Sequence, residues 1–314
     1  MPVENDAEIF RAVLDVMDLG VYIVDLERRI TFWNTGAERI TGYSRTEVMG
    51  RPCRENILVQ GGENGPTVCS LACPMQLTLQ DGLERQEKMY LRHKQGYRVP
   101  VHVKTSALRD GNGHRMAGVE CFTEGWLAGD GKTGAEGKTA LHGQERPSVA
   151  RPREHMEAYL ERGLGVLERE GQSFGVLVVQ VDQWRDLRKT HGKEAADSMM
   201  HVVEETLLYT LGPTDVLGLW DEDKFLVVAR DASVRALELD AELLRGVAAS
   251  AQFRWWGDRL PLTVSVGGGL ALPGDTSQGL MARAHSALEQ CLAHGGNSVT
   301  VAETNSVERA SSEV

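Results

Sequence analysis

Apolar and polar residues follow two different patterns along the chain, and one predicts helices while the other predicts strands. Over residues 7–18 apolar side chains recur every three or four positions, which is the spacing of one face of a helix. Continuous or alternating apolar runs rich in Val and Ile predict strands instead. Helices are expected at 7–18, 34–40, 74–80, 184–190, 193–211, 234–249 and 278–293. Strands are expected at 21–25, 29–33, 85–94, 98–108, 116–123, 174–182, 215–220, 225–229, 260–270 and 298–301.

Capping residues mark the ends of two helices in the first half of the chain. Asn34 stands at the N-cap position of one helix, and Gly42 stands where that helix has to end. Pro74 suits the first position of the other helix, with Cys73 directly before it and Gly82 as its stop. These signals place Cys73 at a helix N-terminus.

The chain is expected to fold as two domains. Its 314 residues exceed one average domain, and residues 125–154 hold many glycines and almost no apolar periodicity, which is typical of a linker. The predicted parts are 1–124, the linker 125–154, 155–304 and a disordered tail 305–314. The last three strands of the first part predict an antiparallel meander, whereas alternating strands and helices in the second part predict an α/β sandwich of two or three layers.

The balance of charges narrows the choice of partners. The chain has 34 basic and 45 acidic residues, a formal net charge of −11. Nucleic acids and anionic membrane surfaces attract positive potential, so neither is expected to be the main target. No apolar run is long enough to span a membrane, and the first residues show no signal-peptide pattern. We therefore predict a cytoplasmic protein.

Five sequence runs occur in one order in the first part of the chain. They are Gly20–Asp25 (GVYIVD), Ile30–Asn34 (ITFWN), Ala37–Ser44 (AERITGYS), Glu47–Gly50 (EVMG) and Lys94–Val103 (KQGYRVPVHV). Through these runs, residues 7–124 resemble a PAS domain. This resemblance implies an antiparallel half-barrel sheet with helices, whose cupped face binds a small molecule or cofactor or whose surface mediates dimerisation. An apolar stripe over residues 9–17 favours a homodimer built on 1–124, and the alternative is that the stripe packs on its own sheet.

Three cysteines of the first domain, Cys53, Cys69 and Cys73, are candidates for one metal or redox site. The loop between them is rich in glycine and can fold back, and a helix N-terminus stabilises a thiolate at Cys73. They could hold a metal ion or an iron–sulfur cluster, or act as redox-sensitive thiols. Their spacing matches no strong metal signature, so small buried apolar side chains are the alternative. The candidates for a fourth ligand are His93, His102 and Cys121.

A series of landmarks runs in one order through the second part of the chain. They are Gln180-Val-Asp182, Trp184-Arg185, Gly192, Asp197, the hairpin 219–228, Leu262–Gly267, Ala284–Leu288 and Gly295–Asn297. Through these landmarks, residues 174–302 resemble the GGDEF domain of diguanylate cyclases, which condense two GTP molecules into cyclic di-GMP. The resemblance implies an α/β sandwich like that of nucleotide cyclases, with metal and nucleotide bound beside a signature hairpin.

The signature of that family has two glycines, two acids and a phenylalanine. Acidic side chains at the two glycine positions add bulk and negative charge beside a triphosphate. Lys224 replaces one acid, and Asp223 keeps the position of a metal ligand. The partner of that ligand is Gln180, whose amide supplies no charge for magnesium, while Asp182 is the second residue of that acidic pair. The signature here is Asp221, Glu222, Asp223, Lys224 and Phe225.

Other functional positions of the family differ as well. Of the two residues that recognise guanine, the asparagine is Arg188 here and the aspartate remains as Asp197. The lysine that contacts phosphate is Leu292, and the arginine of the inhibitory product site is Gly212. The motif that couples input to output stands as residues 146–149, RPSV. Together these differences imply a catalytically inactive relative, a pseudoenzyme.

Three functions are compatible with these residues. In the first, the PAS domain senses a redox, metal or small-molecule cue and signals through an inactive GGDEF-like domain that binds a partner protein. In the second, the chain is an active diguanylate cyclase with unorthodox residues. In the third, Asp182, Asp197 and Asp223 still bind GTP or another nucleotide as an allosteric cue, although single acids in loops are usually solvated.

Overall fold

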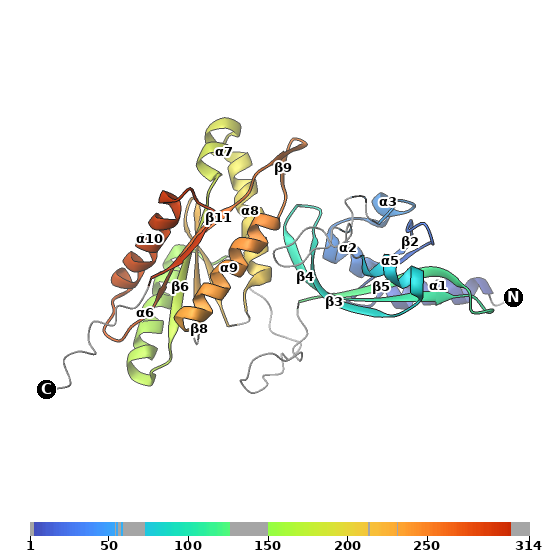
Figure 1. Cartoon of the computed structure of the whole chain (residues 1–314), viewed down its shortest axis with the longest axis horizontal. Helices are drawn as coiled ribbons and strands as arrows, with labels where there is room; N and C mark the ends of the chain where they lie inside the picture. The colour runs from blue at the N-terminus through green and yellow to red at the C-terminus, as the bar shows by residue number, and fades with distance from the viewer. Residues whose placement is uncertain are drawn as a thin grey trace. The chain divides into compact units, whose positions relative to one another are not determined.

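A computed structural model describes residues 3–53, 55, 58, 73–125, 150–212, 214–230 and 232–302. The chain divides into two compact units, Met1–Glu145 and Arg146–Val314 (Figure 1). Cys69, residues 126–149 with the predicted coupling motif, and the predicted tail lie outside the described residues. Among the helices that are described, none is both long and apolar enough to cross a membrane.

The first unit is built on a five-stranded antiparallel sheet in the order β2-β1-β5-β4-β3. The predicted meander is confirmed, because β4 pairs antiparallel with both β3 and β5. The strands are β1 (Gly20–Val24), β2 (Ile30–Trp33), β3 (Arg85–Arg92), β4 (Arg98–Arg109) and β5 (Arg115–Glu124). The helices are α1 (Val3–Asp15), α2 (Thr35–Thr41), α3 (Arg45–Val48) and α5 (Pro74–Asp81).

Asn34 joins three segments at the start of α2, as the predicted N-cap and more. Its Oδ1 accepts hydrogen bonds from the backbone N–H groups of Ala37, at 2.8 Å, and of Val21 in β1, at 2.7 Å. Its Nδ2 donates to the carbonyl of Leu14 in α1, at 2.7 Å. The helix ends at Gly42 with φ 74°, a left-handed conformation that favours glycine.

The helix α5 also begins and ends where the sequence predicts. Cys73 is its N-cap residue, Pro74 lies in its first turn, and Gly82 ends it with φ 77°. The helix is fixed on the sheet, because the hydroxyls of Thr78 in α5 and Thr105 in β4 are hydrogen-bonded at 3.1 Å and both side chains are buried. The residue at its start, Cys73, is therefore held in the interior of the unit.

The second unit has a five-stranded sheet in the order β12-β11-β6-β8-β7. The helices α6 and α10 cover one face and α8 and α9 the other, so the sandwich has three layers (Figure 1). The strands are β6 (Phe174–Val181), β7 (Val216–Asp221), β8 (Lys224–Arg230), β11 (Val264–Leu270) and β12 (Val299–Val301). The helices are α6 (Arg153–Glu170), α7 (Trp184–His191), α8 (Lys193–Thr210), α9 (Val234–Ser250) and α10 (Ser277–Ala293).

The central strand β6 is buried along its whole length and carries apolar side chains to both faces. On one face it contacts a core formed with α6 and α10, in which Met156 and Leu280 are fully buried. The helix α10 lies very close to β11, since a Cβ on Gly267 would come within 2.3 Å of the backbone nitrogen of Leu288. Only glycine allows this approach, which brings the middle of β11 against the helix.

The strand expected at 260–270 is present over Val264–Leu270 as β11, whereas the helices α3 and α6 and a short hairpin were not expected. The hairpin consists of β9 (Phe253–Trp255) and β10 (Asp258–Leu260), and it ends before β11 begins. Pro261 follows β10 directly, and a residue without a backbone N–H cannot continue the ladder. The helix α6 was not expected, because Gly163 and Gly165 in its interior resemble the glycine-rich sequence before it.

The residues just before α6 are attached to β7, the edge strand of the sheet. The backbone N–H of Arg151 donates to the carbonyl of Leu217, and the N–H of Leu219 donates to the carbonyl of Arg151, both at 2.9 Å. The guanidinium of Arg153 lies 4.5 Å from the ring centroid of Trp220. The N-terminal end of this unit is thus joined to the strand that leads into the signature hairpin.

Candidate functional site

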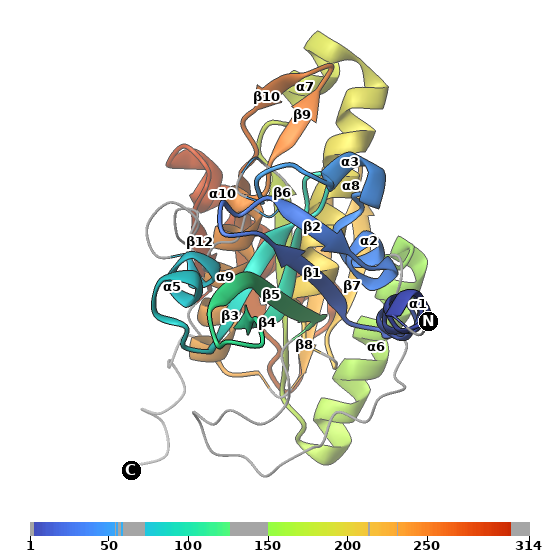
Figure 2. The ribbon, with the colours of Figure 1, turned by 90° about the vertical axis from the view of Figure 1, so that its right-hand side faces the viewer.

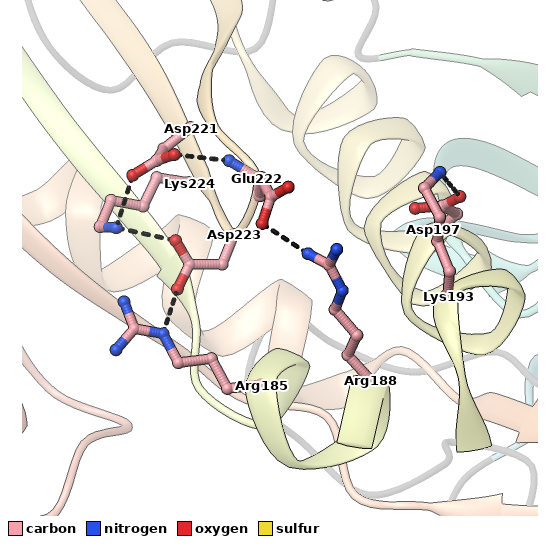
Figure 3. A network of polar contacts seen from close by, with 8 residues as sticks. All are labelled: Arg185, Arg188, Lys193, Asp197, Asp221, Glu222, Asp223 and Lys224. Carbon is pink, nitrogen blue, oxygen red and sulfur yellow. Dashed lines mark hydrogen bonds and ion pairs between the residues drawn. The ribbon is translucent and has the colours of Figure 1, made fainter. Parts of the chain in front are cut away.

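The signature residues lie at the turn between β7 and β8, beside α7 (Figure 3). Asp221 and Lys224 are cross-strand partners at the two sides of the turn. Asp221 accepts a hydrogen bond from the backbone N–H of Glu222, which, with the nearby Lys224 ammonium, lowers the pKa of the Asp221 carboxyl. The turn therefore holds Asp221 as a carboxylate, and the partners of its acids determine what the turn can bind.

The carboxylate of Asp223 is buried, with 3% of the residue exposed, and lies between two cations. The ammonium of Lys224 donates to its Oδ1 at 2.7 Å, and the guanidinium of Arg185 in α7 donates to its Oδ2 at 3.2 Å (Figure 3). Lys224 also donates to Asp221 at 3.2 Å. Both carboxylate oxygens of the predicted metal ligand are thus engaged by this chain's own positive groups.

Gln180 lies next to this cluster at the end of β6. It is the register partner of Lys224 in β8 and of Ser265 in β11, and 8% of it is exposed. The structure therefore brings Gln180 and Asp223 to the same end of the sheet, as the resemblance implies. The group beside Asp223 is an amide, which is a weaker ligand for a hard divalent cation than a carboxylate.

The two predicted guanine positions form ion pairs of their own. The guanidinium of Arg188 in α7 donates to Glu222 of the turn and lies 4.9 Å from the ring centroid of Trp184 (Figure 3). Asp197 in α8 accepts from Lys193 at 2.6 Å, one helical turn away. Asp197 belongs to a separate exposed pair, and the structure shows no contact between it and the cluster at Asp223.

Asp182 is also fully engaged, but by neutral donors. Its carboxylate accepts from the hydroxyls of Thr263 and Ser265, both at 2.6 Å, and from the backbone N–H of Asn297 at 3.0 Å. It thereby joins the end of β6 to β11 and to the turn before β12. This bonding is that of a residue which stabilises the fold.

In the first unit, Cys53 and Cys73 are both buried and lie near one another and near Glu120 of β5. The pKa of the Cys53 thiol is raised to about 12, first by burial and then by the negative charges of Cys73 and Glu120. Burial also raises the pKa of Cys121, which follows Glu120 in β5 and so points to the opposite face of the sheet. Among the described residues, no group of three His, Cys, Asp or Glu side chains is close enough together to hold a metal ion. Cys69 lies outside the described residues.

The other predicted ligand candidates lie in different surroundings. His93 is buried and stacks on Tyr97, with ring centroids 4.2 Å apart. His102 is half-buried on β4. In the second unit, Cys291 of α10 is buried and its Sγ donates to the hydroxyl of Thr300 at 3.2 Å, so it packs the helix against β12.

Two models of protein families match the two units. A model described as a PAS domain matches residues 18–124, and one described as diguanylate cyclase, GGDEF domain, matches residues 151–298. The chain is a PAS domain followed by a GGDEF domain. The first unit is thus the PAS domain, and the hairpin of β7 and β8 carries the signature of the GGDEF domain.

Relatives of known sequence or structure are distant. The probable diguanylate cyclase DgcE of Escherichia coli (strain K12) is 22% identical over 255 residues, which are 81% of this chain and 22% of that protein. The GGDEF domain of DgcB from Caulobacter crescentus, solved in complex with c-di-GMP, is 20% identical and covers 51% of this chain and 99% of its own, with a TM-score of 0.48. The diguanylate cyclase SiaD of Pseudomonas aeruginosa, solved with its activator SiaC, is 22% identical and covers 48% of this chain and 58% of its own, with a TM-score of 0.47.

Sequence reasoning did not find two residues that the structure places in these sites. Arg185 had no predicted role, yet it lies against Asp223. A cation near the start of a helix that follows a strand with a functional acid at its end is a signal that could have identified it. Glu120 lies in a strand whose sequence pattern gives no sign of a functional residue, and the fold brings it near Cys53.

We expect the buried pair of Lys224 and Asp223 to be strongly coupled in stability. Lys224→Met leaves a buried carboxylate with one cation, and should lower the free energy of unfolding by about 3 kcal/mol. The double variant Asp223→Asn/Lys224→Met should lose less than Lys224→Met alone, because no uncompensated charge remains. Chemical denaturation of the four proteins of this cycle measures the coupling.

The matched control is Lys193→Met, which removes a cation from the exposed pair with Asp197. It should change the free energy of unfolding by less than about 1 kcal/mol. Equal losses in the Lys224→Met and Lys193→Met variants would show that the contacts of Asp223 are not coupled in this way.

Proposed function

We propose that this protein is a signalling protein whose PAS domain receives a redox, metal or small-molecule cue and whose GGDEF domain is catalytically inactive. The GGDEF domain then acts as a pseudoenzyme that binds a partner protein or a nucleotide. The observation that carries this proposal is the engagement of both Asp223 oxygens by Lys224 and Arg185.

Electrostatics support this reading of the site. A divalent cation between phosphates is held by anionic oxygen ligands. Around Asp223, the carboxylates of Asp221 and Asp223 are balanced by the cations of Lys224 and Arg185, and Gln180 adds no charge. A metal ion would have to displace the ammonium of Lys224, which is only 12% exposed and donates to both acids.

Two other functions remain candidates because specific residues favour them. An active diguanylate cyclase making cyclic di-GMP from two GTP is favoured by the retained Asp223 and by the family of the domain. A nucleotide receptor is favoured by the retained Asp182 and Asp197. The contacts of these acids argue against both, since Asp182 is bonded to neutral donors of its own fold and Asp197 to Lys193.

We expect no cyclic di-GMP when the purified full chain is incubated with GTP and magnesium and the products are separated by chromatography. The physical reason is that no pair of free carboxylates is available for the metal at Asp223. Calorimetric titration with GTP and with cyclic di-GMP distinguishes a nucleotide receptor from a module that binds only protein.

A gain-of-function variant makes this test sharper. Gln180→Asp/Lys224→Glu replaces an amide and a cation by two acids, and should acquire binding of manganese, measured by the paramagnetic relaxation of water protons. Asp258→Asn, on the exposed hairpin of β9 and β10, is the control that should change neither the formation of cyclic di-GMP nor the binding of manganese. Product from the unmodified chain that disappears in Asp223→Asn would establish an active cyclase.

In the PAS domain, we propose that Cys53, Cys69 and Cys73 form one metal or redox site. The neighbourhood of Cys53 and Cys73 supports this, because the two thiols come from distant parts of the sequence and are buried together at the N-terminus of α5. Zinc and iron–sulfur clusters bind cysteines as thiolates, and bound metal ions would supply the positive charge that offsets the burial raising the pKa of the Cys53 thiol. Loss or oxidation of the bound group would then alter the packing at α5.

We expect protein purified without oxygen to contain zinc or iron, measured by elemental analysis and the visible spectrum. Cys69→Ser and Cys73→Ser should abolish the bound metal, because each removes a ligand. Cys291→Ser, in the other domain, should keep it. Metal-free protein in which the three PAS thiols all react freely with a thiol reagent would contradict the proposal.

The exposed face of α1 supports a homodimer formed by the PAS domain. Phe10 is 69% exposed, Ile9 51% and Val13 46%, so the apolar stripe is not covered by its own sheet. A contiguous apolar face of this kind is stabilised when it is buried against another copy.

We expect light scattering at micromolar concentration to give the mass of a dimer, and Phe10→Glu to give that of a monomer. Leu239→Ala, another exposed apolar position, is the control that should stay dimeric, and a monomeric unmodified chain would contradict the proposal.

A further inference from the structure

The C-terminal end of α1 is attached to the start of α2 by side-chain hydrogen bonds. The carboxylate of Asp15 accepts from the backbone N–H of Thr35 at 3.0 Å and from its hydroxyl at 3.3 Å. The amide of Asn34 donates to the carbonyls of Leu14 and Leu19, at 2.7 and 3.0 Å. Figure 2 shows α1, α2 and β1 next to one another. The exposed apolar stripe therefore belongs to a helix whose end is fixed on α2.

A guanidinium of α2 also joins the segment after α1 to the last strand of the PAS domain. Arg39 donates through Nη2 to the carbonyl of Asp18 and through Nη1 to the carboxylate of Glu124, at 3.2 Å. Glu124 is the last residue of β5. Directly after it, the backbone N–H of Gly125 donates to the carbonyl of Pro100 in β4 at 2.8 Å. Arg39 thus connects α1 with the exit of the PAS domain, the point where the chain leaves its sheet toward the GGDEF domain.

This connection is weak enough to be adjustable. The side chain of Arg39 is 51% exposed and that of Glu124 is 26% exposed, and ion pairs in such surroundings contribute little to stability. Without the pair, β1 would still be joined to β5 along its whole length, and Asn34 would still cap α2. The contact is therefore not needed for the fold, and it can transmit a difference between two states of α1.

We propose that Arg39 is a positioning residue that couples α1 to the exit of the PAS domain. Burial of the apolar stripe against a second copy would restrict the motion of α1 and of the segment at Asp18 that accepts from Arg39. The guanidinium, held at this end, would then stay at Glu124, and opening of the sheet at Gly125 would become rarer. Coupling of this kind needs a difference in mobility and no change of fold.

The coupling rests on the homodimer proposed above and adds how that dimer would affect the segment that leads to the GGDEF domain. Coupling between two sites is reciprocal. A force that opens the exit at Gly125 would therefore weaken association through α1 by the same factor. In this way the association of PAS domains and the state of the linker would influence each other.

The test is hydrogen–deuterium exchange of the full chain, measured by mass spectrometry on peptides that contain Gly125. Exchange should be about threefold slower in the unmodified dimer than in Phe10→Glu, because an exposed ion pair can transmit no more free energy than it contributes. Arg39→Met should keep the mass of a dimer, and in this variant the addition of Phe10→Glu should leave the exchange rate unchanged. A purely structural role of Arg39 would instead speed exchange equally in dimer and monomer and leave the threefold ratio in place.

The matched control is Lys94→Met, which removes the exposed ion pair with Glu47 in the same domain. This variant should keep the threefold ratio between dimer and monomer. Loss of the ratio in Lys94→Met, or its persistence in Arg39→Met, would overturn the coupling. So would equal exchange at Gly125 in the unmodified dimer and in Phe10→Glu.

A second comparison tests the coupling without the dimer. Ala12 is exposed in α1, and glycine at this position weakens the helix. Added to the monomeric Phe10→Glu, Ala12→Gly should speed exchange at Gly125 by about twofold, and it should have no effect when Arg39→Met is also present. An unmodified chain with the mass of a monomer would contradict the homodimer, and this comparison would then decide the coupling: exchange that does not respond to Ala12→Gly would overturn it.

Discussion

A buried carboxylate has to keep its positively charged partners or lose its charge. In the GGDEF domain this constraint applies to Asp223, at the signature turn between β7 and β8. Its two partners come from different elements, Lys224 from β8 and Arg185 from α7. Breaking a buried ion pair by removing one partner typically costs about 3–5 kcal/mol, far more than an exposed pair contributes. The turn between β7 and β8, the end of β6 and the first turn of α7 are therefore held in one arrangement.

The same constraint separates a structural use of acids from a catalytic one. An acid that binds a metal must have oxygens free to exchange ligands, whereas Asp223 and Asp182 have theirs committed to groups of the chain. The neighbouring ion pair of Arg188 and Glu222 adds a further contact between α7 and the turn. Rigid surfaces of this kind suit recognition, because little conformational entropy is lost when a partner binds.

Much of the fold could be predicted from the sequence because its signals are local. Asn34 and Gly42 cap α2, and Cys73 and Gly82 flank α5, as expected from the conformations these residue types favour. The helix α6 could not be predicted in this way. It has an apolar face, but the glycines in its interior weaken the helical signal, and packing on the sheet stabilises the helix.

The candidate site could be predicted only in part, for a related reason. The resemblance to the GGDEF family identified the signature acids, but the partner of each acid depends on which side chains the fold brings near. The contact of Arg185 with Asp223 joins residues far apart in sequence, and so does the neighbourhood of Cys53 and Glu120. The strand expected at 260–270 starts only at Val264, and the local cause is Pro261, which the apolar pattern outweighed in the prediction.

The pairing of Arg151 with the outer edge of β7 has a consequence for self-association of the sheet. An open edge strand is a template on which another chain can add a strand, and natural proteins cover or interrupt such edges. Here Arg151 occupies the hydrogen-bonding groups of Leu217 and Leu219, and Pro152, which has no N–H to offer, follows immediately. The segment that enters this domain thereby covers part of the β7 edge and leaves fewer backbone groups there for a strand of another chain.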